Sequence, residues 1–585
     1  MTHITWKNIY NNVIQHKKKL FLGTLIVLIA EAILAPVPMF LPFIADEVFL
    51  NEDHGIKSFI EKIIGGVDNQ TLLIIAISLT IILRSIGVFF LFISTKIFNI
   101  VSKTITHKIR EKMLDESKQT MIKEFETKGS GAISSKFVTD VNTIEGFIDD
   151  TIALVLKESL VIILIGTIIF ILSPWLAAFI IVFGPIAMLA TKTFRNTIKK
   201  WTGKYNAAIE DFQDSTVEYL DYAQQLRVDH KEEWAIAKLK EKSNQLKEID
   251  IEKSWRTSLI NEIINTIFSI GMAIFYFVGF SLILYGEGSI GTVLAMVPYF
   301  FMFAGSLSKF SQIQLQFYNA EKALERINEY INLDKEDDFN TEKQIATKKK
   351  ITFNNVNFGY SKEKQILYNT NLTIEPNKVT AVVGKTGSGK STLIQLLFGL
   401  HNTWNGDIKI GDDSIYDIGF NQVREKIGAV LQNPVLFNTS IRENLLYGAD
   451  IPDKKLWEVL NIVQLDDTVK SLPDGLDTLV GKGGIRMSGG QKQRLSIART
   501  ILLNPEIIVF DEATSALDNE TEFLMHQKIL KEFKDRTTLI IAHREATIIN
   551  ADIIHVMKHG QVVETGTYNE LMNQKGEFFN IYRKK

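Results

Sequence analysis

Long apolar runs fill the first half of the chain and constrain its fold more than any other feature. A helix needs about 20 mostly apolar residues to cross about 30 Å of hydrocarbon. Runs such as VIILIGTIIFIL are typical of membrane helices, and buried helices of a large soluble protein are the weaker alternative. Six stretches reach or approach the required length: Leu20–Ile44, Leu72–Thr95, Ala153–Leu172, Trp175–Ala190, Leu259–Tyr285 and Ile290–Leu307.

The charges between these stretches predict their orientation, because positively charged loops stay on the cytoplasmic side. Lys7 and the cluster Lys17–Lys19 precede the first span, and residues 96–150 hold nine Lys or Arg residues. The loop 46–70 holds only two lysines among six acids. Both termini are therefore expected in the cytoplasm, with an even number of crossings.

Two connections on the cytoplasmic side are unusually long. Residues 88–128 and 204–270 contain neither glycine nor proline, so we expect uninterrupted helix there. A fully helical 96–128 would extend about 50 Å, well past the headgroups. Residues 121–131 and 215–229 are candidate contact segments at the tips, although both could equally be solvated helical hairpins.

Charged residues and prolines interrupt the apolar runs. Glu31 and Arg84 are costly in hydrocarbon, and such groups commonly face a bundle interior and pair. We expect Glu31 to neutralise Arg84, with contact to a transported molecule as the alternative. Prolines remove backbone donors and are expected to bend the first, fourth and sixth spans at Pro36, Pro38, Pro42, Pro185 and Pro298.

The pattern changes after a charged segment. Residues 333–350 are rich in charge and indicate a linker, and from Ile351 onward short β-branched runs alternate with helical stretches. That alternation is typical of an α/β domain with a largely parallel sheet. The predicted fold is therefore multi-domain, with an all-α six-helix transmembrane domain at 1–332 followed by an α/β P-loop domain at 351–585.

The sequence GKTGSGKS follows a predicted strand and opens a helix. Glycine-rich loops of this spacing present backbone N–H groups to a polyphosphate. Lys390 is expected to reach the β/γ positions, and the Ser391 hydroxyl is a candidate Mg²⁺ ligand. The candidate ATP-binding residues are Gly384, Lys385, Thr386, Gly387, Ser388, Gly389, Lys390, Ser391 and Thr392.

Two acids end another apolar strand in the sequence IIVFDEA. Asp511 is a candidate Mg²⁺ ligand, and its neighbour Glu512 is a candidate general base for the attacking water. A helix-capping pair of acids is the structural alternative. The phosphate loop in the same domain favours the catalytic interpretation.

The sequence MSGGQKQRLSIART distinguishes this domain from kinases and GTPases. Ser488, Gly489 and Gly490 can offer a hydroxyl and unobstructed N–H groups at a helix start, which is a second anion site without a phosphate of its own. A nucleotide held by a second copy of the chain would complete it.

At these motifs the chain resembles an ABC transporter, in the form of an exporter-type half-transporter that fuses six membrane helices to one ATPase domain. The resemblance implies ATP and Mg²⁺ as cofactors. It implies adenine stacking for Tyr360, metal contact and sensing for Gln432, and γ-phosphate contact for His543. It also implies that Gln491, as part of the signature, meets the ATP of the partner chain. The loop 515–518 would reach across to the partner's ATPase domain.

Two positions depart from the family pattern. Met487 replaces the usual leucine, a change that conserves size, and Leu479 stands where exporters usually have an acid that contacts the cytosolic helices. The catalytic set is otherwise intact, which favours a homodimer over a heterodimer.

The resemblance implies ATP-driven export or flipping of a small amphipathic molecule, a lipid or a peptide. An importer built on the same fold, of the siderophore type, is the first alternative, and a DNA-maintenance ATPase is the second. The chain has no cysteine, and its net charge of −2 gives no attraction for nucleic acid. Its abundance of Lys, Ile and Asn indicates an AT-rich bacterial genome, so we expect the bacterial inner membrane.

Overall fold

The computed structural model describes residues 3–40, 43–49, 65, 68–286, 289–336, 349–481, 483–511, 528, 532–542 and 545–583. The chain divides into two compact units. The helical unit comprises residues 1–117 and 130–332, and the α/β unit comprises residues 118–129 and 333–585.

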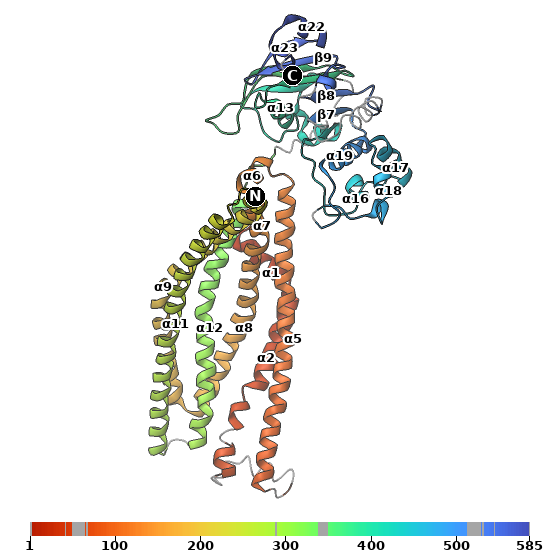
Figure 1. The fold of residues 1–585 in the computed structure, drawn as a ribbon. Helices are drawn as coiled ribbons and strands as arrows, with labels where there is room; N and C mark the ends of the chain where they lie inside the picture. Colours follow the sequence, from red (N-terminus) through yellow and green to blue (C-terminus); the bar gives the residue numbers. More distant parts are fainter. Residues whose placement is uncertain are drawn as a thin grey trace. The chain divides into compact units, whose positions relative to one another are not determined.

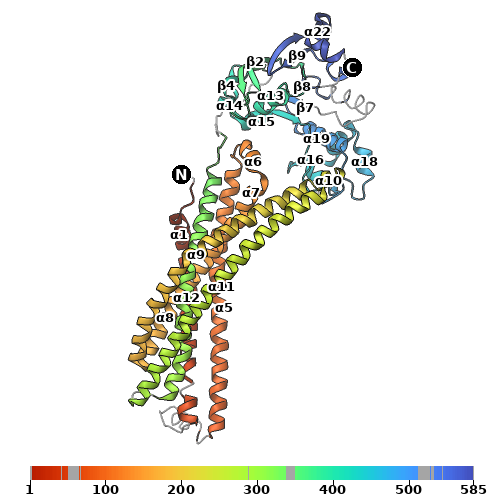
Figure 2. The same ribbon diagram turned by 60° about the vertical axis from the view of Figure 1, so that its left-hand side comes forward.

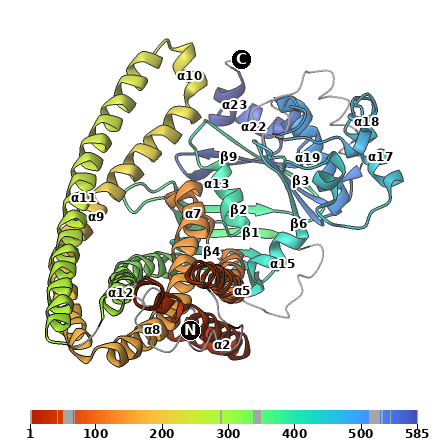
Figure 3. The same ribbon diagram turned by 90° about the horizontal axis from the view of Figure 1, so that it is seen from below.

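Long helices pack in pairs in the helical unit. Each helix of a pair runs beside its partner over much of its length, and α9 and α11 are joined at one end by α10 (Figures 1 and 3). The pairs are α2 (Lys17–Leu34) with α5 (Asn69–Ser117), α8 (Val141–Leu172) with α12 (Ile290–Ile331), and α9 (Pro174–Asp221) with α11 (Glu232–Leu284). Shorter elements are α1 (Trp6–Gln15), η1 (Val37–Met39), η2 (Phe43–Phe49), α7 (Ser130–Ser135), η3 (Lys136–Asp140) and α10 (Ala223–Val228).

The predicted spans coincide with these helices. Among the described residues, Lys17–Val48, Asn69–Ser117 and Glu232–Leu284 are long and apolar enough to cross a membrane, and Pro174–Ile186 and Ile290–Ser306 are shorter apolar helices. Large apolar side chains point outward from them, as Phe92 on α5 and Phe277 on α11 do. An apolar outer surface of this extent is suited to lipid.

Prolines and serines set several helix ends in the spans. The helix α2 stops at Leu34, just before Pro36, and the chain continues in η1 and η2, so the helix ends where the sequence predicts a bend. Pro185 and Pro298 lie inside α9 and α12, whereas Pro42 falls outside the described residues. The Ser289 hydroxyl accepts a hydrogen bond from the Thr292 N–H at 3.0 Å and caps α12.

The expectation of uninterrupted helix at both cytosolic extensions is wrong. The helix α5 ends at Ser117, and a separate short helix, α6 (Ile122–Lys128), follows. The helix α9 ends at Asp221, and the chain reverses through α10 before α11 begins. No glycine was needed for that reversal, because His230 adopts a left-handed conformation with φ of 55°.

Two sheets form the frame of the α/β unit. The larger has the order β10-β9-β3-β8-β7-β6, in which β9, β3, β8, β7 and β6 are parallel, and the smaller is the antiparallel sheet β2-β1-β4-β5 (Figure 2). The strands are β1 (Ile351–Phe358), β2 (Leu367–Ile374), β3 (Val379–Gly384), β4 (Asn405–Ile410), β5 (Asp413–Ser414), β6 (Ile427–Val430), β7 (Ile507–Asp511), β8 (Thr537–Ile541), β9 (Ile553–Lys558) and β10 (Gln561–Gly566).

Helices pack around these sheets, and three apolar cores support them. One core joins both sheets to α13, a second fills the layer formed by α16, α17 and α19, and a third joins the larger sheet to α22 and α23. The helices are α13 (Lys390–Leu397), α14 (Ile415–Ile418), α15 (Phe420–Lys426), α16 (Ile441–Leu446), α17 (Asp453–Ile462), α18 (Asp466–Lys470), η4 (Gly475–Asp477), α19 (Gly489–Leu503), α21 (Glu545–Ile548), α22 (Tyr568–Gln574) and α23 (Glu577–Tyr582). The prediction of a helical domain followed by an α/β domain is confirmed.

The segment 118–129, which contains α6, belongs to the α/β unit. Its backbone pairs with the start of the charged segment 333–350: the Met121 N–H donates to the Asp334 carbonyl at 2.9 Å, and the Glu336 N–H donates to the Gln119 carbonyl at 2.7 Å. The Lys123 ammonium lies 2.5 Å from the Asp334 carboxylate. The segment is therefore held by defined contacts within the α/β unit.

Candidate nucleotide-binding site

The phosphate loop occupies the turn between β3 and α13. Gly387 and Gly389 have φ of 81° and 98°, a region that side chains disfavour. A Cβ on Gly384 would lie 2.4 Å from the Met557 carbonyl oxygen, and one on Gly389 would lie 2.7 Å from the Leu367 side chain. These positions need glycine, so the loop's shape follows directly from its sequence.

Lys390 and Ser388 fit a bound polyphosphate. The Lys390 ammonium is buried and donates to the Gly384 carbonyl at 2.9 Å and to the Lys385 carbonyl at 3.1 Å, so it lies folded over the loop. The Ser388 Oγ is buried and has no hydrogen-bond partner among the described residues. Phosphate oxygens are suitable acceptors for both groups.

Ser391 and Asp511 meet across the sheet. The strand order β3-β8-β7 brings the carboxyl ends of β3 and β7 to one edge. There the Ser391 hydroxyl lies 3.4 Å from Asp511 Oδ1. Hydroxyl and carboxylate oxygens are hard donors that suit Mg²⁺, so these two residues fit the expected metal, which would supply positive charge to neutralise the phosphates.

Gln432 follows β6, which is the neighbour of β7. Its side chain is exposed, and its backbone carbonyl accepts a hydrogen bond from Gln493 Nε2 at 3.3 Å. The parallel strands thus bring Gln432 to the same edge of the sheet as Ser391 and Asp511.

Tyr360 lies just beyond β1 and is half exposed, at 55%. Its hydroxyl is 3.2 Å from the Thr392 hydroxyl and also hydrogen-bonds Gln395, so the ring is tied to α13 directly behind the phosphate loop. Phe358 and His401 meet the ring edge to face, with centroid distances of 5.2 Å and 5.3 Å. An exposed aromatic face held this way can stack on a nucleobase.

The signature residues open α19. The Ser488 hydroxyl accepts from the Gln491 N–H at 3.2 Å, and the Gln491 side chain accepts from the Ser488 N–H at 2.8 Å, which is a capping box. Ser488 and Gly489 are exposed, and Gly490 is half-buried. Met487 is buried in the neighbouring apolar core, as its size predicts.

Several predicted residues fall outside the described part of the chain: Glu512, His543 and the loop 515–518. Of the remaining loop residues, Lys385, Thr386 and Gly387 are exposed. Among the described residues, no group of three or more His, Asp or Glu side chains could hold a metal ion. The candidate Mg²⁺ ligands remain the three that the motifs predict: Ser391, Asp511 and Gln432.

The expected pairing of Glu31 with Arg84 is wrong. The Glu31 carboxylate is buried and lies 3.9 Å from the ammonium of Lys157 on α8, whereas Arg84 is exposed on α5. A second buried acid, Glu158, accepts from Lys309 at 2.6 Å. The composition of each run gave no way to foresee which helices would become neighbours.

Ser306 supplies a further, uncharged partner for Glu158. Its hydroxyl donates to the other carboxylate oxygen of Glu158 at 2.6 Å. The acids Glu31 and Glu158 and the lysines Lys157 and Lys309 thus form a balanced cluster between α2, α8 and α12.

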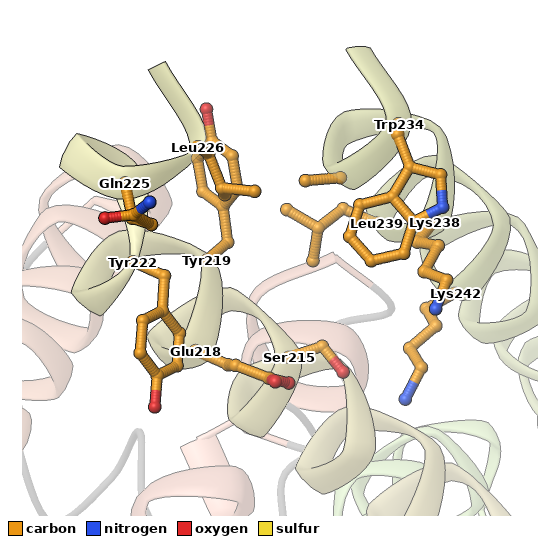
Figure 4. A pocket seen from close by; sticks show the side chains of 11 residues that line it. Ser215, Glu218, Tyr219, Tyr222, Gln225, Leu226, Trp234, Lys238, Leu239 and Lys242 are labelled. Carbon is orange, nitrogen blue, oxygen red and sulfur yellow. The ribbon is translucent and has the colours of Figure 1, made fainter. Parts of the chain in front are cut away.

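A pocket of about 390 Å³ opens where α9, α10 and α11 meet. Figure 4 shows Tyr219 and Leu226 on one side facing Trp234 and Leu239 on the other. The remaining lining residues are Ser215, Glu218, Tyr222, Gln225, Ala235, Lys238 and Lys242. The second predicted contact segment, 215–229, lines one side of the pocket and α11 lines the other, and the lining is largely apolar.

Comparison with known proteins agrees with this geometry. The ABC transporter family matches residues 367–515, and the ABC transporter transmembrane region matches residues 20–307. A multidrug resistance ABC transporter ATP-binding and permease protein of Lactococcus lactis is 30% identical over 489 residues, covering 82% of each chain.

Two further relatives widen the comparison. An ATP-dependent lipid A-core flippase of Syntrophus aciditrophicus is 27% identical and covers 83% of this chain and 81% of its own. The structure of a bacterial Atm1-family ABC exporter with ATP bound superposes with a TM-score of 0.81 at 23% identity, covering 97% of this chain and 98% of that one.

Membrane helices and a nucleotide site fused in one chain define an ATP-driven membrane translocase. The chain belongs to the ABC transporter family, as a half-transporter of the exporter type.

Proposed function

We propose that the chain is one half of a homodimeric exporter that uses ATP to move a small amphipathic molecule, a lipid or a peptide across the bacterial inner membrane by alternating access. The observation that carries the proposal is the joining of apolar membrane helices to an α/β unit in which the phosphate loop and Asp511 meet. Both termini lie in the cytoplasm in this proposal, in accord with the lysine-rich loops.

In the proposed site, ATP lies with its adenine on Tyr360 and its phosphates in the loop Gly384–Thr392. Ser391, Asp511 and Gln432 would hold Mg²⁺, Glu512 would activate the attacking water, and His543 would contact the γ-phosphate. The Ser391–Asp511 distance of 3.4 Å and the buried Ser388 hydroxyl support this arrangement.

A second copy completes each site. Ser488, Gly489, Gly490 and Gln491 open α19, and Ser488 and Gly489 are exposed there. We propose that this helix start closes on the ATP held by the partner, because the positive end of a helix dipole favours an anion. ATP can drive this closure only because it binds the closed pair of ATPase domains more tightly than the open pair.

The α9–α11 tip is proposed to transmit closure to the membrane helices by contacting the ATPase domain of the second copy. Leu479 supports this proposal, since it is exposed at 59% where related exporters usually carry an acid. An apolar residue suits an aromatic, apolar pocket such as that of Figure 4 better than a carboxylate does.

The relatives favour outward transport. The relatives compared above are named as a multidrug resistance transporter and a lipid A-core flippase. Neither name favours the importer alternative. Measuring ATPase stimulation of the reconstituted protein by lipids, peptides and lipophilic cations would identify the substrate class. Uptake into inside-out vesicles would support export, and ATP-dependent loss from preloaded vesicles would contradict it.

A further inference from the structure

His401 lies between the segment 118–129 and the residue proposed to hold adenine. It follows α13 and precedes β4, and only 8% of it is exposed. One edge of the imidazole meets the Tyr360 ring at a centroid distance of 5.3 Å and an interplanar angle of 87°. Phe358 packs against it at 5.5 Å. The imidazole therefore fixes one side of the Tyr360 ring.

The other side of His401 faces α6. Its Nε2 lies 3.8 Å from the Glu126 carboxylate, which is beyond hydrogen-bond distance, and it has no hydrogen-bond partner among the described residues. A buried polar nitrogen without a partner is costly, so its position beside a carboxylate calls for an explanation. A small approach of α6 would close that gap and satisfy the nitrogen.

The nucleotide site continues this line of contacts. Tyr360 is tied through its hydroxyl to Thr392 and Gln395 on α13, the helix that follows the phosphate loop. Glu126, His401, Tyr360 and α13 thus form one continuous series of contacts inside the α/β unit.

We propose that His401 is a positioning residue that holds Tyr360 for the adenine and makes this support depend on Glu126. The segment 118–129 thereby adjusts the affinity of the site for ATP. This inference rests on the proposed role of Tyr360.

Protonation strengthens the link. Burial holds the pKa of His401 below its usual value of 6.5, while Glu126 raises it and Lys123 lowers it. Among the described residues, these two side chains on α6 are the charged groups that act on the imidazole, and Tyr360 is the other titratable group against it. Acidification favours the imidazolium, which donates a charge-assisted hydrogen bond to Glu126. Glu126 should therefore matter more as the pH falls.

The first test compares the KM for ATP of the full-length chain in lipid nanodiscs. His401→Ala should raise KM about two- to tenfold, the range for losing an aromatic edge contact, with kcat little changed. His401→Phe keeps the ring and should restore KM. Glu124→Gln is the matched control for the Glu126→Gln variant of the second test. Glu124 is also on α6, but its carboxylate pairs with the Lys128 ammonium at 3.8 Å.

The second test uses pH. The KM for ATP of Glu126→Gln, divided by that of the unmutated protein, should rise roughly two- to fivefold as the pH falls from 7.5 to 5.5. The ratio is used because protonation of ATP affects both proteins equally. In the His401→Phe background, Glu126→Gln should have no such effect. This second pair of variants keeps the ring, so it remains informative if His401→Ala does not fold.

Three outcomes would overturn the inference, and they show which part of it is wrong. If Tyr360→Ala raises KM but His401→Ala does not, or if Glu126→Gln acts equally in both backgrounds, the link through His401 is wrong and the role of Tyr360 stands. If Tyr360→Ala leaves KM unchanged, the proposed adenine contact is wrong and the inference fails with it.

Discussion

The hydroxyl of Ser391 lies 3.4 Å from the carboxylate of Asp511, although 120 residues separate them in the chain. Ser391 lies in the first turn of α13, and Asp511 ends β7. The parallel strands β3, β8 and β7 bring the two residues to one edge of the sheet. This relationship supports a single Mg²⁺-ATP site built from two distant motifs.

Asp511→Asn should therefore weaken the metal site more than the nucleotide site. The change removes the carboxylate charge but keeps the side chain's size. The Mg²⁺ concentration for half-maximal ATPase activity should rise at least tenfold, since even outer-shell partners of metal sites account for 10- to 100-fold in metal affinity. A magnesium titration of ATPase activity measures this, and an unchanged midpoint would contradict the assignment.

Glu512→Gln tests the general base. Turnover should fall about 10²- to 10⁴-fold, the usual range for losing such a group, while ATP binding is retained. Steady-state hydrolysis and equilibrium binding of a fluorescent ATP analogue separate the two effects. Near-normal hydrolysis in this variant would show that Glu512 is not the base.

The buried carboxylate of Glu158 ties α8 to α12 through Lys309 and Ser306. Glu158→Gln leaves the Lys309 ammonium without its counter-ion, and we expect a loss of up to about 3 kcal/mol because Lys309 is partly exposed and can turn toward water. The thermal midpoint of the purified protein should fall. Combining Glu158→Gln with Lys309→Gln should recover part of the loss.

The control for this prediction is Arg84→Gln, because Arg84 is exposed on α5. It should leave the thermal midpoint close to that of the unmutated protein. A Glu158→Gln midpoint equal to that of the control would mean that the ion pair contributes nothing to the fold.

His555 makes the stability of the α/β unit depend on pH. It is buried and bridges two strands, with Nδ1 2.9 Å from the Thr565 hydroxyl and Nε2 2.9 Å from the Thr373 carbonyl. Burial lowers its pKa below the usual value of 6.5, although the Thr373 carbonyl opposes this. The unfolded chain therefore binds the proton more readily.

The direction of this pKa shift predicts the pH range in which the α/β unit loses stability. The stabilisation is present above about pH 6.5 and decreases as the pH falls below that value toward the folded pKa. Urea unfolding followed between pH 7.5 and 5 should show this decrease, and His555→Gln should reduce it. His559→Gln alters an exposed histidine nearby and should not. Equal pH dependence in all three proteins would contradict the role of His555.

The sequence predicts those features that depend on local pattern. The apolar runs indicate the spans, and the spacing of GKTGSGKS indicates a loop whose glycines the structure requires at Gly384, Gly387 and Gly389. Alternating strands and helices indicate the parallel sheet that brings Asp511 to Ser391.

Features that depend on which elements become neighbours could not be predicted. The partner of Glu31 is on α8, and nothing in either run specifies that α2 and α8 touch. The turn at His230 has no glycine to indicate it, because a histidine adopts the left-handed conformation that usually favours glycine. His401 had no motif around it, and only its place between Glu126 and Tyr360 makes it relevant.

The central claim is that each ATP site needs the signature of a second copy. The most direct test compares the ATPase rate per chain in nanodiscs that hold one copy and in nanodiscs that hold two. Two-copy discs should hydrolyse ATP, and single-copy discs should show no more than the Glu512→Gln background. Equal rates per chain in both would contradict the claim.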